Sequence, residues 1–290
     1  MLPRQQHFEY SALPRRPQFS WPSGKRLAFH LCLNLEVFSF NSGLGVSYSP
    51  GLPHPNSYNW GWREYGNRVG VWRLIELFDQ LQLPVSLLLN SEIYDHCPEV
   101  VAAFRARGDE IVGHGRTNSE HQNDFDEAGE AQLIREVTQA IARHEGKPPA
   151  GWLSPGVNPS ERTPDLLQEA GYRYILDWPM DDQPVWMKTR NGRILSVPYP
   201  QEVNDIPMIV LHHGTAPEFA AMIVDQFDEM LRQSQQQSLV FGVSIHSFLV
   251  GQPFRLPHLR RALEHIRAAA HRVWFATTGQ IAQHFTETVG

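Results

Sequence analysis

The chain has 290 residues, of which 41% are hydrophobic and 19% are charged, a composition typical of a globular protein with one large core. Its formal net charge of -6 gives no reason to expect nucleic acid or an anionic membrane as a partner. The two cysteines, Cys32 and Cys97, do not support a disulfide framework. No apolar run is long enough to span a membrane and no signal peptide is visible, so we expect a cytoplasmic protein.

The first 24 residues are predicted to form an arm on the surface of the protein or of a neighbouring subunit. They are polar and rich in proline and arginine, which disfavours regular secondary structure. Residues 25–290 contain no linker-like stretch and no internal repeat, so we expect them to form a single domain.

Strand and helix signals alternate through this domain. Apolar runs predict strands at 26–35, 84–89, 110–113, 151–156, 172–176, 194–198, 239–245 and 273–276. Helical spacing predicts helices at 69–82, 98–108, 127–145, 163–170, 217–233, 255–271 and 278–285. Residues 38–62 are predicted to form a long irregular loop, with a role in function or in an oligomer contact. The alternation implies a parallel sheet and predicts an α/β fold, a distorted or incomplete TIM-like (β/α) barrel.

Residues 111–121 (I-V-G-H-G-R-T-N-S-E-H) mark an abrupt change of polarity. A buried strand stops at Gly113, and two histidines, His114 and His121, follow it. In α/β enzymes a polar side chain at a strand end is held at the mouth of the sheet, where chemistry takes place. A plain surface loop with two stray histidines is the alternative interpretation of this stretch alone.

Similar polar residues follow most of the predicted strands, and in a parallel barrel all of these strand ends face one rim. The residues are Asn34, Glu36, His114, Asn118, Trp152, Asp177, Trp178, Asn204, Asp205 and His246. Histidines and carboxylates that converge on one mouth are typical of a general acid–base site or a metal site. The set therefore predicts a hydrolytic enzyme.

These motifs resemble the polysaccharide deacetylase (NodB-homology) family over nearly the whole chain. The family has an Asp-Asp pair, a His-x-x-x-His motif, an Arg-x-Pro motif and a late histidine. Here C-L-N-L-E-V carries Asn34 and Glu36, H-G-R-T-N carries His114 and Asn118, and G-W-L-S-P-G has a leucine in place of the arginine; the late histidine is His246. The resemblance implies a zinc site with an aspartate as base, but two of these positions are amides, which are poor zinc ligands.

A branch of this family that contains bacterial allantoinases and cyclic-imide hydrolases is similar over longer stretches. They are W-R-E-Y-G-N-R-V-G-V-W-R, E-A-G-Y-R-Y-I-L-D-W-P-M-D-D-Q-P, N-D-I-P-M and I-H-S-F-L-V-G-Q-P-F-R. This resemblance implies hydrolysis of amide bonds in small rings, without a required metal, by a distorted barrel that assembles as a homotetramer.

Ring opening needs an activated water, a stabilised oxyanion and an acid for the leaving nitrogen, and the strand-end residues can supply these roles. We predict Glu36 as the base, with His114 and His246 orienting water and donating a proton. We predict that Asn34 and Asn118 donate to the oxyanion or to ring carbonyls. Ring stacking is predicted for Trp152 and Trp178, and contacts to ring N–H groups for Asp177, Asp182, Asn204 and Asp205. If a divalent metal such as zinc is bound, its predicted ligands are Glu36, His114 and Asn118.

Two other functions stay open at this point. One is N-deacetylation of a polysaccharide or of a small acetylated amine, and the other is a catalytically inactive barrel with a binding role. The sequence assigns no role to His121, His212, His213 or Arg63.

Overall fold

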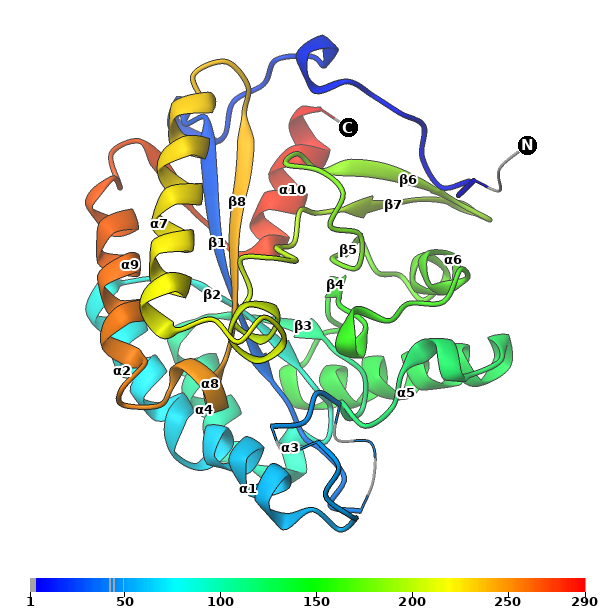
Figure 1. The fold of residues 1–290 in the computed structure, drawn as a ribbon. Coiled ribbons are helices and arrows are strands. Elements are labelled where there is room, and N and C mark those ends of the chain that lie inside the picture. The colour runs from blue at the N-terminus through cyan, green and yellow to red at the C-terminus, as the bar shows by residue number, and fades with distance from the viewer. Residues whose placement is uncertain (1–3, 42, 44, 49, 290) are drawn as a thin grey trace.

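The protein is built on one curled sheet, an incomplete barrel of mostly parallel strands (Figure 1). The computed structural model describes residues 4–41, 43, 45–48 and 50–289, and in this part of the chain the sheet has nine strands. They are β1 (Leu27–Leu35), β2 (Val85–Leu89), β3 (Glu110–Gly113), β4 (Gly151–Trp152), β5 (Tyr174–Ile175), β6 (Val185–Thr189), β7 (Gly192–Ser196), β8 (Leu239–His246) and β9 (Val273–Phe275). The prediction of a distorted (β/α) barrel is confirmed.

The strand order is β6-β7-β5-β4-β3-β2-β1-β8, with β9 beside the first half of β1. Only β6 and β7 pair antiparallel. Strand β1 is buried along its entire length, which explains its nearly continuous apolar sequence. It lies between β2 and β8, and its register with β8 places Asn34 opposite His246 (Figure 1). The sheet ends at β6 on one side and at β8 on the other, and an isolated bridge joins Asn204, in the segment after β7, to Ser244 on β8.

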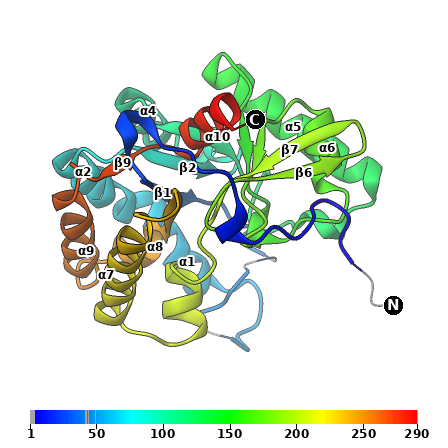
Figure 2. The ribbon, with the colours of Figure 1, turned by 90° about the horizontal axis from the view of Figure 1, so that it is seen from above.

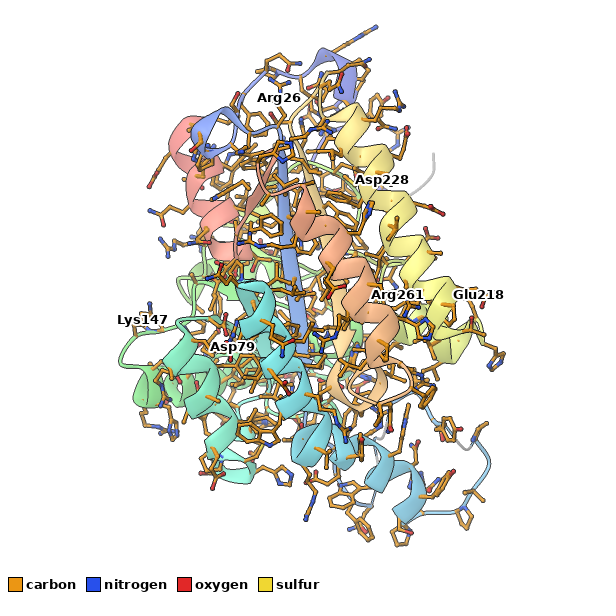
Figure 3. The ribbon with its side chains drawn as sticks, turned by 90° about the vertical axis from the view of Figure 1, so that its left-hand side faces the viewer. Arg26, Asp79, Lys147, Glu218, Asp228 and Arg261 are labelled. Atoms are coloured by element: carbon orange, nitrogen blue, oxygen red, sulfur yellow. The ribbon has the colours of Figure 1, made fainter. Side chains whose placement is uncertain are left out.

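Helices cover the outer face of the curled sheet (Figure 2). They are α1 (Ser57–Tyr65), α2 (Val71–Leu81), α3 (Ile93–His96), α4 (Pro98–Arg107), α5 (Glu127–Glu145), α6 (Thr163–Glu169), α7 (Ala216–Gln233), α8 (Ser247–Val250), α9 (Leu256–Ala268) and α10 (Thr278–Thr288). Figure 3 shows Asp228 on α7 and Arg261 on α9 in this outer layer, where charged side chains remain hydrated. Within the described residues, no helix has both the length and the apolar character required to cross a membrane.

The predicted loop 38–62 is shorter than expected, because α1 begins at Ser57 and runs through a π-helical turn, Gly66–Gly70, into α2. Asn56 caps α1 by accepting a hydrogen bond from the backbone N–H of Asn59. A Cβ atom at Gly70 would lie 2.2 Å from the Ser247 carbonyl oxygen. Gly70 therefore permits close packing of this helix against α8. Residues 42, 44 and 49 of this loop lie outside the described residues.

The N-terminal arm packs on its own chain, and residues 1–3 of it lie outside the described residues. The backbone N–H of Lys188 on β6 donates to the His7 carbonyl at 2.6 Å, so the arm extends the edge of the sheet. Further along, Trp21 is buried, and its indole N–H donates to the Leu239 carbonyl. Strand β6 itself was missed by the sequence analysis, although the turn at Asn191 before Gly192 is typical of a hairpin.

Candidate active site

A cavity of about 190 Å³ opens at the carboxyl ends of β1, β3 and β8. This is the lower end of the sheet in Figure 1, beside α1 and α8. Its polar lining comes from distant parts of the chain and comprises Asn34, Glu36, Arg63, His114, Asn118, His121, Gln201, Asn204 and His246. Most of this polar lining therefore consists of the strand-end residues that were predicted to meet at one rim. Three of these side chains form the centre of the cavity.

Glu36 is the central carboxylate of the cavity. It is only 7% exposed, and its Oε1 accepts a hydrogen bond of 2.5 Å from the Asn118 amide. The same oxygen lies 3.6 Å from Nε2 of His114 and 3.5 Å from Nε2 of His246. Burial alone would raise the pKa of Glu36, but the charge of His246 and the contacts with both imidazoles outweigh it and hold the pKa well below its usual range. Glu36 is therefore an anion at neutral pH.

His246, the last residue of β8, is held by Asp205. Its Nδ1–H donates to one carboxylate oxygen of Asp205 at 2.6 Å, and its backbone N–H donates to the other at 2.8 Å. Burial opposes the charged imidazolium, but attraction to Asp205 and Glu36 raises the pKa of His246 to about 9. At neutral pH His246 is therefore a cation that presents an Nε2–H group to the cavity.

His114 is held by a backbone carbonyl group, whereas His246 is held by a carboxylate. Its Nδ1 lies 2.8 Å from the carbonyl oxygen of Leu153. Because a carbonyl oxygen can only accept, this contact places a proton on Nδ1 and turns Nε2 toward the cavity. The Nε2 atom is buried and has no hydrogen-bond partner among the described residues. The cavity thus holds the Nε2 atom of one imidazole, a carboxylate and an imidazolium N–H within a few ångströms of one another.

The two asparagines of the cavity are engaged with the protein. The amide nitrogen of Asn34 donates to Ser244 Oγ at 2.9 Å and to the Ile245 carbonyl at 3.2 Å. Both contacts lie within the protein, and donation by Asn34 to an oxyanion or to ring carbonyls stays a prediction. Asn118 directs its N–H toward Glu36 and accepts from Asn90 at 3.1 Å. Its contribution is to orient the carboxylate.

Trp152 and Asp177, predicted to contact substrate, are not among the residues that line the cavity. The Trp152 ring is fully buried in the core against Tyr172, and its indole N–H donates to Gln122 at 2.8 Å. Asp177 accepts 2.6 and 2.8 Å hydrogen bonds from the backbone N–H and the hydroxyl of Ser154. Trp152 ends the short strand β4 and Asp177 follows the short strand β5, and the polar groups of both side chains find partners within the protein, which strand position alone does not reveal.

Trp178 and Asp182 are also displaced from the cavity. The Trp178 ring lies edge-on to Phe8 of the N-terminal arm at 5.7 Å. Asp182 lines a separate groove of about 750 Å³ between the arm and the open edge of the barrel. Asn204 does line the cavity, where its Oδ1 accepts from the backbone N–H of Ile206 at 3.1 Å. Asp205 contacts His246 and is not among the residues that line the cavity.

Two residues without a predicted role, Arg63 and His121, line the cavity. Arg63 is 5% exposed, and its guanidinium carbon lies 3.8 Å from the centre of the Phe38 ring. It comes from helix α1, and a strand-end argument could not find it. The remaining histidine pair, His212 and His213, is exposed beyond the second π-helical turn, Ile206–Leu211.

The donor set does not fit the zinc ion that the family resemblance implies. In the part of the chain that the structure describes, no group of three or more His, Cys, Asp or Glu side chains is arranged to hold a metal ion. Asn118 presents its N–H group to Glu36, and its oxygen is turned toward Asn90. Zinc sites in proteins take three or four N, S or O donors, so the predicted set of Glu36, His114 and Asn118 is incomplete.

The fold and the cavity define a curled α/β barrel with a buried acid–base cluster at the carboxyl ends of its strands. The polysaccharide deacetylase family profile matches residues 61–175. The crystal structure of PuuE allantoinase superposes with a TM-score of 0.81 at 25% identity, covering 97% of this chain and 98% of that one. A Pseudomonas aeruginosa PAO1 structure assigned as a polysaccharide deacetylase gives 0.80 at 25% identity, covering 96% and 98%. A Schizosaccharomyces pombe protein assigned to the same family is 25% identical over 91% of both chains. The chain is thus similar to polysaccharide deacetylases, in sequence over residues 61–175 and in fold along nearly its whole length.

Proposed function

We propose that the protein hydrolyses a carbon–nitrogen bond in a small cyclic amide or imide. The observation that carries the proposal is the grouping of Glu36, His114 and His246 around one small cavity. The similarity to PuuE allantoinase along 97% of the chain supports an amide ring as the substrate. Hydrolysis of an amide needs a base, an acid and a polar environment for the developing oxyanion, and this cluster contains the first two.

The protonation states suggest which residue takes part in each proton transfer. A carboxylate whose pKa is held far below neutral is a weak proton acceptor, so Glu36 orients the attacking water by accepting one of its hydrogens. His114 Nε2, which has no hydrogen-bond partner among the described residues, takes the other proton. The water oxygen bonds to the ring carbonyl carbon, and the C–N bond then breaks. His246 Nε2–H gives its proton to the leaving nitrogen, and the product is a ring-opened carboxylic acid.

The size of the cavity favours a small molecule over a polymer. Sites for drug-sized ligands enclose roughly 300–1,000 Å³, and this cavity has about 190 Å³. Apolar side chains of Phe38, Val46, Pro207 and Leu211 form part of its wall. N-deacetylation is the second candidate function, because related proteins are assigned as deacetylases and the same cluster could cleave an acetamide.

A proton-NMR time course would separate these functions. The purified protein is incubated with allantoin, succinimide, hydantoin, dihydrouracil and an N-acetylglucosamine oligomer, with and without a chelator. We expect ring-opened product from at least one ring, in wild type and not in His114→Ala. Acetate release from the oligomer would instead establish deacetylation, and loss of ring opening in the chelator arm would show that a metal takes part.

A further inference from the structure

We infer that Arg63 determines substrate specificity by binding a carboxylate, so that the substrate is a small cyclic amide that carries an anionic group. The inference depends on the proposed function for the amide bond, but recognition of the anion by Arg63 can be tested without turnover. It starts from an unusual feature of the cavity, a buried guanidinium that faces the reactive cluster from the wall formed by helix α1.

The position of Arg63 is fixed by aromatic packing. Its guanidinium carbon is 3.8 Å from the Phe38 ring centre, and the ring centres of Trp62 and Phe248 lie at 5.5 and 5.3 Å. Cation–π contacts of this kind hold the planar group without using its N–H donors. Arg63 is therefore preorganised, with its hydrogen-bonding edge available for a partner.

The donors of Arg63 exceed the acceptors that the protein provides. A guanidinium has five N–H groups. One nitrogen, Nη2, donates to the Val46 carbonyl, whereas the buried Nε has no hydrogen-bond partner among the described residues. Burial lowers the pKa of Arg63 to about 10, and Glu36 partly opposes that change, so the group remains a cation at neutral pH. A buried charge without a close counterion is unfavourable, and a ligand anion would remove that cost.

Glu36 does not fill this role. It forms no ion pair with Arg63 within 4.0 Å, and its negative charge is already matched by His246 and hydrogen-bonded by Asn118. Arg63 and this cluster nevertheless line one cavity of about 190 Å³. A molecule that reaches both must be short, with the carboxylate only a few bonds from the amide carbonyl. This distance favours a ring substituted directly with a carboxylate or through a single methylene.

Titration calorimetry on the full-length protein at pH 7 tests the inference with matched probes. The probes are 5-oxoproline, its neutral carboxamide 5-oxoprolinamide, and 2-pyrrolidinone, which share one lactam ring and differ in the charged substituent. A hydrogen-bonded ion pair should make 5-oxoproline bind about 10- to 150-fold more tightly than either neutral probe. Equal affinities in the wild type would overturn the inference without any variant.

Variants then assign the preference to Arg63. In Arg63→Met the ratio of affinities should fall to about one, and in Arg63→Lys part of it should remain. Arg68→Met is the matched control, because Arg68 is exposed on the adjoining turn and should leave the ratio unchanged. A ratio that survives in Arg63→Met, with the fold checked by circular dichroism, would assign recognition to another residue.

The same probes distinguish failure of the inference from failure of the proposed function. Selective, Arg63-dependent binding without opening of any ring would leave the inference standing and reject the ring hydrolase. If rings do open, Arg63→Met should raise KM for the carboxylate-bearing ring and leave kcat nearly unchanged. An equal fall of kcat on charged and neutral rings would show that Arg63 acts on the oxyanion, and would reject carboxylate recognition.

Discussion

Two buried carboxylates at strand ends, Glu36 and Asp177, have opposite environments. Glu36 faces a cavity, shares one oxygen among Asn118, His114 and His246, and has a pKa held well below its usual range. Asp177 lies under the loop after β4, and both of its oxygens accept from Ser154. Burial raises the pKa of Asp177 to about 7. Asp177 thus holds a loop in place, whereas Glu36 takes part in a cluster that still has open hydrogen-bonding positions.

This difference shows that a polar residue at a strand end indicates a functional site only when its hydrogen-bond partners are known. In the cavity, an unpartnered imidazole nitrogen lies beside an anion and a cation. Around β4 and β5 the polar groups satisfy one another, as buried polar groups in a stable core usually do. Substitutions in the two regions should therefore affect different properties, catalysis in the first and stability in the second.

The largest effect is expected for His114→Ala, which removes the proposed base. Turnover of a ring substrate should fall by about 10²–10⁴-fold, the usual contribution of a general acid or base, with the fold unchanged. Steady-state kinetics and circular dichroism measure the two properties. His121→Ala is the matched control, since His121 lines the cavity at its half-buried edge. Equal loss in both variants would contradict the assignment of His114.

The next effect concerns pH. The pKa of His246 is raised to about 9, so the imidazolium required as acid is present below that pH and is lost as the pH rises through it. We expect kcat/KM of the wild type to decline above about pH 9. Asp205→Asn removes an attraction that raises this pKa, so the alkaline decline should move to lower pH, with an overall loss of roughly 10- to 100-fold. A pH profile that does not move would show that Asp205 does not set this proton.

Asp177→Ala should act on stability instead. It leaves the backbone N–H of Ser154 buried without its acceptor, which should lower the free energy of unfolding by about 1–3 kcal/mol. Urea denaturation measures this loss, and kcat/KM per folded molecule should change little. A collapse of activity in folded Asp177→Ala would mean that the loop of Ser154 has a direct catalytic role.

The smallest effect is expected for Trp152→Phe. This change keeps an aromatic ring in the core and removes only the hydrogen bond from the indole to Gln122. The free energy of unfolding should fall by about 1 kcal/mol, and ring opening should be unaffected. If substrate KM rose strongly in this variant, the indole would contact the ring after all.

Much of the barrel could be predicted from sequence because its strands are buried on both faces. The boundaries of the central strands β1, β3 and β8 were predicted to within one residue, because nearly continuous apolar runs are typical of buried strands. The short strands β4 and β5 were longer in the prediction than in the structure, and β6 was missed. β4 and β5 have only two residues each, too few for a periodic pattern, and β6 is an edge strand with a single buried residue.

The alternation of strands and helices could be read from the sequence, as could the presence of His114, Glu36 and His246 at the same end of the sheet. Local patterning carries this information, because parallel strands bring their carboxyl ends to one rim. The hydrogen-bond partners of each polar group could be identified only from the tertiary structure. In the folded protein Asn34 contacts Ser244, Trp152 is buried in the core, and Arg63 lines the cavity although it belongs to a helix. Hydrogen bonds and burial depend on contacts between residues far apart in the chain, and no spacing in the sequence records them.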